Sequence, residues 1–133
     1  MNICVCVDDS MGMSFFGRRQ SRDRLLIERL LSHTEYDRIL IGDCSAPLFA
    51  EFGDSRVCTG CSDDGERAVH FIELGDIPDP SEIDSIILYR WNRKYPSDKK
   101  FPFSPEEVGF RLVSTADFTG NSHDNITEEI WTK

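Results

Sequence analysis

The apolar run that decides the fold is Asn2-Ile3-Cys4-Val5-Cys6-Val7, and it stops at Asp8-Asp9. Successive side chains in this run are apolar, without the polar alternation of a strand that has one face in water. The run therefore predicts an interior strand with a neighbouring strand on each side. A chain of 133 residues has room for one such core, so we expect residues 1–133 to form a single domain.

Helix and strand patterns alternate along the rest of the chain. Ser21 and Ser45 are candidate N-caps, the first for a helix that runs to about Leu31 and the second for a helix with Pro47 in its first turn. A polar turn is expected over residues 61–66 and loops over Met11–Gly17 and Lys94–Pro105. The predicted strands are Arg38–Ile41, Arg56–Thr59, Ala68–Leu74, Ser85–Trp91, Phe110–Ser114 and Ile126–Trp131. This order predicts an α/β fold, a three-layer αβα arrangement with a mainly parallel central sheet and an antiparallel C-terminal strand pair.

The net charge of the chain and its cysteine content indicate which partners and which cellular compartment to expect. A formal net charge of −9 repels phosphate backbones, so nucleic-acid binding is disfavoured. The basic residues gather within residues 18–29 and 90–100, either as solvated faces or as a local anion site. The first residues read as a strand and no apolar run could span a membrane, so a cytoplasmic location is expected. An odd set of five cysteines predicts reduced thiols.

Several strings, taken in order, resemble the dihydrofolate reductase family. Ile3–Val7 followed by Met11-Gly12-Met13 resembles that family's first strand and glycine-containing active-site loop, and Arg38–Gly42 resembles the strand that ends at its coenzyme crevice. The tail is similar too, with Phe101-Pro102, then Phe110, then Asn121-Ser122-His123. The resemblance implies a dihydrofolate reductase-like fold and places Asp23 where the family keeps its pterin-binding carboxylate.

The middle of the chain departs from the family pattern. No Gly-Gly turn, which would present backbone N–H groups to a phosphate, occurs between Gly75 and Ile86. Asp43 stands after Gly42, where the family has a basic residue for the coenzyme phosphate, and Arg19-Gln20 replaces its Pro-Trp pair. We therefore expect a non-catalytic relative that binds a small molecule or a protein partner and needs no cofactor. An NADPH-dependent reductase of the same type is the alternative.

Metal-dependent chemistry is disfavoured by the histidine and cysteine content. Short bacterial chains with the string Arg18–Arg24 often carry the label ribonuclease Z, but that two-zinc chemistry needs a dense set of ligands. His33, His70 and His123 lie far apart in the sequence. Cys58-Thr59-Gly60-Cys61 offers half of a zinc site, and we expect no bound metal. Asp8-Asp9 is interpreted as a turn, and Ser122-His123-Asp124 as the polar end of a strand connection.

The predicted ligand site lies at the carboxyl end of the first strand, where open α/β sheets bind ligands. Gly12 would allow close approach of the backbone, and Arg22 would supply a cation. Arg19 and Asp23 are four residues apart and would share one helix face beside an anionic or pterin-like ligand. On this hypothesis Asp23 contributes only the strength of a helix cap, ~0.5–1 kcal/mol, to stability.

Overall fold

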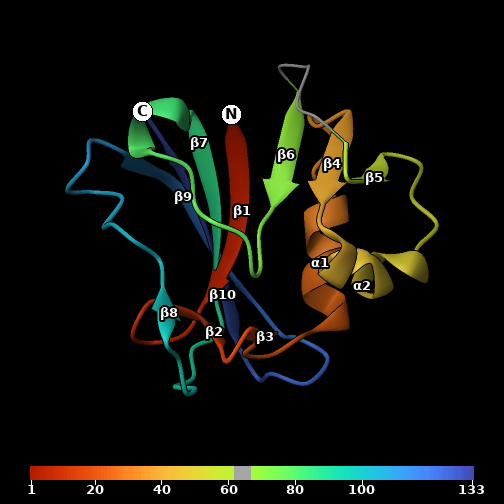
Figure 1. Ribbon diagram of the computed structural model, residues 1–133, viewed down its shortest axis with the longest axis horizontal. Helices are drawn as coiled ribbons and strands as arrows, with labels where there is room; N and C mark the ends of the chain where they lie inside the picture. The colour runs from red at the N-terminus through yellow and green to blue at the C-terminus, as the bar shows by residue number, and fades with distance from the viewer. Residues whose placement is uncertain (62–66) are drawn as a thin grey trace.

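The computed structural model describes residues 1–61 and 67–133, and the chain forms a curved seven-stranded sheet with helices against one face (Figure 1). The strands follow the order β5-β4-β6-β1-β7-β10-β9. Most of the polar turn predicted over residues 61–66 lies outside the described residues. The bounds of the strands are β1 Asn2–Val7, β4 Arg38–Ile41, β5 Val57–Thr59, β6 Ala68–Phe71, β7 Ser85–Arg90, β9 Arg111–Phe118 and β10 Ile126–Thr132.

The interior position predicted for the first strand is confirmed. β1 pairs parallel with β6 on one side and with β7 on the other. β4 continues the parallel part of the sheet between β6 and β5. β10 pairs antiparallel with both β7 and β9, which confirms the antiparallel C-terminal strand pair. The architecture is thus α/β, with a mainly parallel sheet that carries an antiparallel edge.

The two faces of β1 belong to two separate cores. Cys4 points into a core built with α1, Arg24–Leu31, and α2, Ala46–Ala50. Leu26, Ile27 and Leu30 form the buried stripe of α1, as the apolar spacing predicted. Within residues 1–61 and 67–133 the other helical segments are two short 3-10 helices, η1 at Asp43–Ser45 and η2 at Pro80–Glu82.

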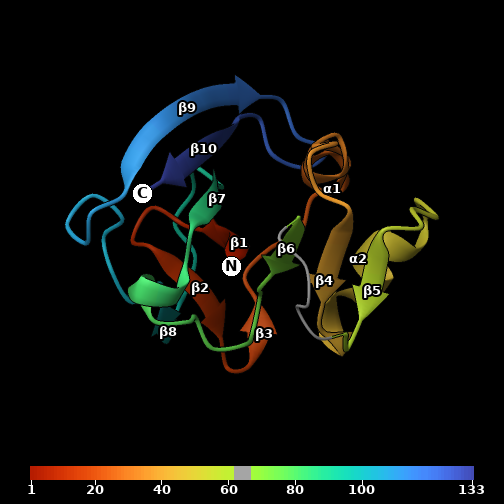
Figure 2. The ribbon, with the colours of Figure 1, turned by 90° about the horizontal axis from the view of Figure 1, so that it is seen from above.

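The opposite face of the sheet is covered without an α-helix from the described residues. Ile3, Val5 and Val7 pack there against Met13 and Phe101. The cover is a small sheet of β3 Arg18–Arg19, β2 Gly12–Phe15 and β8 Lys99–Lys100, which Figure 2 shows away from α1 and α2. The three layers are therefore helices, central sheet and a small sheet with loops. The connection between β6 and β7 carries Pro78 and Pro80 and holds only the single turn η2.

A hairpin replaces the loop predicted over Met11–Gly17. β2 and β3 pair antiparallel around Phe16 and Gly17, with Phe15 opposite Arg18. Phe16 and Gly17 have φ values of 50° and 70°, the left-handed conformations that a two-residue type I′ turn requires. Phenylalanine seldom adopts a positive φ, which is why the sequence did not indicate the turn.

The state of the cysteines differs in part from the prediction that all five are reduced thiols. Cys58 and Cys61 form a disulfide at the end of β5, so the expectation of reduced thiols is wrong for this pair, while Cys4, Cys6 and Cys44 are free. β9 is an outer strand whose Leu112 and Val113 are exposed. No helix in the described part of the chain is long and apolar enough to cross a membrane.

Truncation of Leu30 tests the core beneath α1. Leu30 is fully buried, so we expect Leu30→Ala to leave a cavity and to lower the free energy of unfolding by about 3 kcal/mol. Urea denaturation measures the change. Leu112→Ala is the matched control, because that side chain is exposed and should change stability by no more than about 0.5 kcal/mol. Equal losses in the two variants would contradict the assignment of the core.

Candidate functional site

Asp23 is the buried centre of the candidate site. It is the N-cap of α1 in place of the predicted Ser21, and its Oδ1 accepts hydrogen bonds from Leu25 N at 2.9 Å and Leu26 N at 3.4 Å. The loop between β9 and β10 supplies four further donors, one of them the Ser122 hydroxyl at 3.4 Å from Oδ2. Asn121 N reaches Oδ1 at 2.8 Å, and Ser122 N and His123 Nδ1 each reach Oδ2 at 2.9 Å.

The side chain of Asp23 is fully buried. Burial alone would raise the pKa of this carboxyl group, but the N–H donors of the loop and of His123 outweigh it and lower the pKa to about 2. The carboxylate stays ionised at neutral pH and holds α1 against the β9–β10 loop.

Two glycines near this site are needed for close packing. A Cβ atom on Gly120 would overlap Asp23 Oδ2, so only glycine lets the β9–β10 loop approach the carboxylate. Gly12, which the sequence analysis placed in the ligand site, lies on β2. A Cβ atom there would stand 2.6 Å from the Cβ of Ser97 and 2.7 Å from Nε2 of Gln20. The close approach at Gly12 is therefore to the protein's own side chains.

His123 links Asp23 to two hydroxyl groups. Its Nε2 lies 3.0 Å from Ser21 Oγ and 3.0 Å from the hydroxyl of Tyr95. The Trp91 ring stacks on the imidazole, with ring centroids 4.6 Å apart. The carboxylate that binds His123 belongs to Asp23, not to its sequence neighbour Asp124. The hydroxyl groups at Nε2 belong to Ser21 and Tyr95, not to Ser122.

Arg19 lies in a different environment from Asp23. Because α1 begins at Arg24, Arg19 falls in β3, and the predicted pairing of Arg19 and Asp23 on one helix face does not form. Its guanidinium binds Glu73 through Nε at 2.8 Å and Nη2 at 3.0 Å. Ser45 donates to the same carboxylate at 2.6 Å, which explains why this N-cap makes no side-chain bond to α2. The hydrogen bond to Glu73 raises the pKa of Arg19.

Two cavities divide the predicted site residues, and Asp23 lines one of them. The larger, which we name the α1–α2 pocket, has a volume of about 450 Å³ and is lined by Arg22, Asp23, Arg24, Ile27, Pro47, Leu48, Glu51, Asn121 and Ser122. The smaller, the Ser21 cavity, has a volume of about 10 Å³ and is lined by Cys6, Met13, Arg19, Gln20, Ser21, Ile72, Glu73 and Trp91. Arg22 and Asp23 thus line one cavity and Arg19 the other, while Gly12 lines neither.

Asp8 is part of a turn, as interpreted from the sequence. Its Oδ1 accepts from the backbone N–H groups of Ser10 and Gly12, and its Oδ2 from Tyr95 N at 3.0 Å. Burial works against these bonds, but together they lower the pKa of Asp8. Across the described residues, no group of three or more histidine, cysteine, aspartate and glutamate side chains is arranged to hold a metal ion.

Comparisons with known proteins bear on the fold. No family model matches the chain, and no curated protein matches it by sequence. Among solved structures, dihydrofolate reductase from Enterococcus faecalis, complexed with NADP(H) and RAB-propyl, is similar with a TM-score of 0.65. The match has 10% sequence identity and covers 98% of this chain and 94% of that chain. The fold is that of dihydrofolate reductase. At this identity the likeness shows the fold alone, and it lends no support to the ribonuclease Z label.

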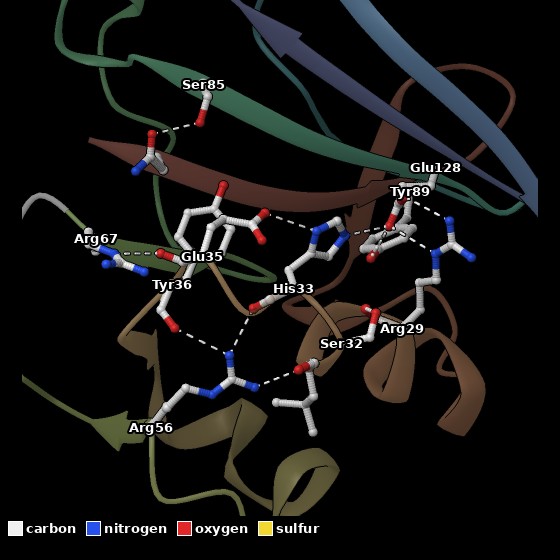
Figure 3. A network of polar contacts seen from close by, with 12 residues as sticks. Arg29, Ser32, His33, Glu35, Tyr36, Arg56, Arg67, Ser85, Tyr89 and Glu128 are labelled. Atoms are coloured by element: carbon white, nitrogen blue, oxygen red, sulfur yellow. Dashed lines mark hydrogen bonds and ion pairs between the residues drawn. The ribbon is translucent and has the colours of Figure 1, made fainter.

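Besides Asp23 and Asp8, the fold contains a third buried carboxylate, Glu128, which the local sequence patterns did not indicate. Glu128 on β10 accepts from Arg29 at 3.1 Å, His33 at 2.9 Å and the Tyr89 hydroxyl at 2.8 Å (Figure 3). Burial would raise its pKa, but these donors lower it to about 2. In turn the Glu128 bond outweighs burial and raises the pKa of His33. The available signal was the strand alternation, because Glu128 shares a face with buried Ile126.

The loss of the Asp23 charge tests the role of that carboxylate. We expect Asp23→Asn to lower the free energy of unfolding by about 3 kcal/mol at pH 7, because an amide places its own donors against buried N–H groups. Since the pKa of Asp23 falls from 3.8 to about 2 on folding, the deficit should shrink as the pH falls from about 4 to 2. Asp124→Asn, an exposed change in the same loop, is the control. A loss of no more than about 1 kcal/mol for Asp23→Asn, the strength of a cap, would contradict this role.

The Glu128 network predicts a second pH dependence, now on the basic side. The pKa of His33 is raised on folding, so its contribution is full below the ordinary value of 6.5 and is lost as the pH rises through the higher folded value. The stability difference between the wild type and His33→Gln should therefore shrink above about pH 6.5. Chemical denaturation between pH 5 and pH 9 measures it. The exposed Thr34→Ala variant should show no such trend, and a difference independent of pH in His33→Gln would exclude this contribution.

Proposed function

We propose that the protein is a binding domain with the dihydrofolate reductase fold, and that it takes a small anionic molecule in the α1–α2 pocket. The observation that carries the proposal is Arg22. Its exposed guanidinium lines this pocket and has no hydrogen bond or ion pair with any other described side chain. A volume of about 450 Å³ lies in the usual range for small-molecule sites.

The other charged side chains that line the pocket already have partners within the protein, so Arg22 is the cation available to a ligand. Arg24 donates to Glu51 at 2.9 Å and its guanidinium lies over the Phe52 ring. Asp23 is saturated by donors from α1 and the β9–β10 loop. Ile27 and Leu48 supply an apolar wall. An isolated guanidinium beside such a wall fits a carboxylate or phosphate attached to an apolar group.

The side chains at the carboxyl ends of the parallel strands favour ligand binding over NADPH-dependent reduction, because they fill the place where a coenzyme would lie. The Arg19–Glu73 ion pair and Ser45 occupy this place, and the Ser21 cavity beside them holds only about 10 Å³. Asp43 is exposed in the first turn of η1, directly after Gly42, and its charge would repel a coenzyme phosphate. These features favour the binding domain over the reductase alternative.

A thermal-shift screen with citrate, inorganic phosphate and folic acid tests the proposal. We expect at least one of these anions to raise the melting temperature of the wild type and Arg22→Gln to abolish that rise, because the substitution removes the cation of the pocket. Arg18→Gln is the matched control, since Arg18 is exposed on β3 outside the α1–α2 pocket.

NADPH fluorescence separates this proposal from the reductase alternative. We expect no saturable binding of NADPH in the micromolar range and no turnover of dihydrofolate. Saturable NADPH binding, a rise in melting temperature that survives Arg22→Gln, or no stabilisation of the wild type by any of the three anions would each overturn the proposal.

A further inference from the structure

Ser21, His123 and Asp23 form a continuous chain of hydrogen bonds. Asp23 Oδ2 lies 2.9 Å from His123 Nδ1, and His123 Nε2 lies 3.0 Å from Ser21 Oγ. A carboxylate, an imidazole and a hydroxyl in this order are the parts of a serine nucleophile with its general base. The three residues come from the start of α1 and from the β9–β10 loop, about 100 positions later in the chain.

The contacts of His123 favour the imidazole tautomer that such a nucleophile needs. The ionised Asp23 carboxylate only accepts, so His123 Nδ1 carries the hydrogen and Nε2 presents its lone pair to Ser21. Burial and the stacked Trp91 ring hold the imidazole in this orientation. The Tyr95 hydroxyl lies 3.0 Å from Nε2 and 3.4 Å from Ser21 Oγ, and when it donates to Ser21 Oγ the serine hydrogen is left for Nε2.

Ser21 also faces space that a reactant can enter. It is partly exposed and lines the Ser21 cavity together with Arg19 and Gln20. Oε1 of Gln20 is buried and lacks a hydrogen-bond partner among the described residues, so an acceptor for a further donor stands at this cavity. A volume of about 10 Å³ holds one water at most, so an ester has to reach Ser21 from the exposed side of this residue.

We propose that Ser21 is an acylatable nucleophile that hydrolyses carboxylic esters, with His123 as general base and Asp23 as a positioning residue. Ser21 Oγ gives its proton to His123 Nε2 and bonds to the ester carbonyl carbon. The bond from that carbon to the alcohol oxygen then breaks, and the alcohol leaves with the proton from Nε2. A water gives a proton to Nε2 and attacks the acyl carbon. Ser21 Oγ departs, recovers that proton, and the carboxylic acid is released.

Labelling with a fluorophosphonate and acetylation by 4-nitrophenyl acetate test the proposal. We expect one adduct per chain, mapped by peptide mass spectrometry to Ser21, and no adduct at this position in Ser21→Ala. His123→Gln should slow labelling by about 100-fold or more, the usual share of a general base. Ser32→Ala is the matched control, because Ser32 is exposed at the opposite end of the same helix and should leave the rate unchanged.

A second variant keeps the test decisive if Ser21→Ala does not fold. Ser21→Cys retains a nucleophilic atom next to Nε2 and should be acetylated as a thioester at position 21. An unlabelled wild type, equal labelling of wild type and His123→Gln, or an adduct on Tyr95 in place of Ser21 would overturn the proposal.

Discussion

The buried carboxylate of Asp23 is the contact on which the arrangement of this molecule depends. It accepts from the first N–H groups of α1 and from four donors of the β9–β10 loop, so one charge joins the helix layer to the antiparallel edge of the sheet. Gly120 exists in this loop because any side chain would occupy the place of the carboxylate. The same carboxylate orients His123 and forms part of the wall of the α1–α2 pocket.

The sequence predicted those parts of the fold that depend on local apolar patterns, such as β1 and α1. β1 is apolar on both faces because β6 and β7 flank it and two cores meet on it, and the spacing of Leu26, Ile27 and Leu30 placed α1. The sequence did not predict the β2–β3 hairpin, because Phe16 in its turn adopts a positive φ that phenylalanine disfavours. Helices on both faces were expected, yet the short connection through Pro78 and Pro80 leaves room for one 3-10 turn.

The site could be read only in part, because its decisive contacts join distant positions. Ser21 and Asp23 are equally acceptable caps by residue type. The donors at Asn121 to His123 select Asp23, and they lie almost 100 residues later. Arg19 and Asp23 would share a helix face only if α1 began before Arg19. Arg19 instead lies in β3, and its guanidinium binds Glu73. Strand alternation could have indicated that Glu128 is buried, but no local pattern indicates its partners Arg29 on α1 and His33 just after it.

The position of β1 has a consequence for how the chain acquires its structure. β1 precedes every other strand along the chain, yet Asn2 pairs with Val69 and with Ser85. The backbone N–H and C=O groups along both edges of β1 therefore stay without strand partners until the chain has been made as far as β6 and β7. Such a topology has a high contact order, which slows folding and prolongs the exposure of an aggregation-prone segment. The strand at the centre of the sheet is therefore the segment whose pairing has to wait longest after its own synthesis.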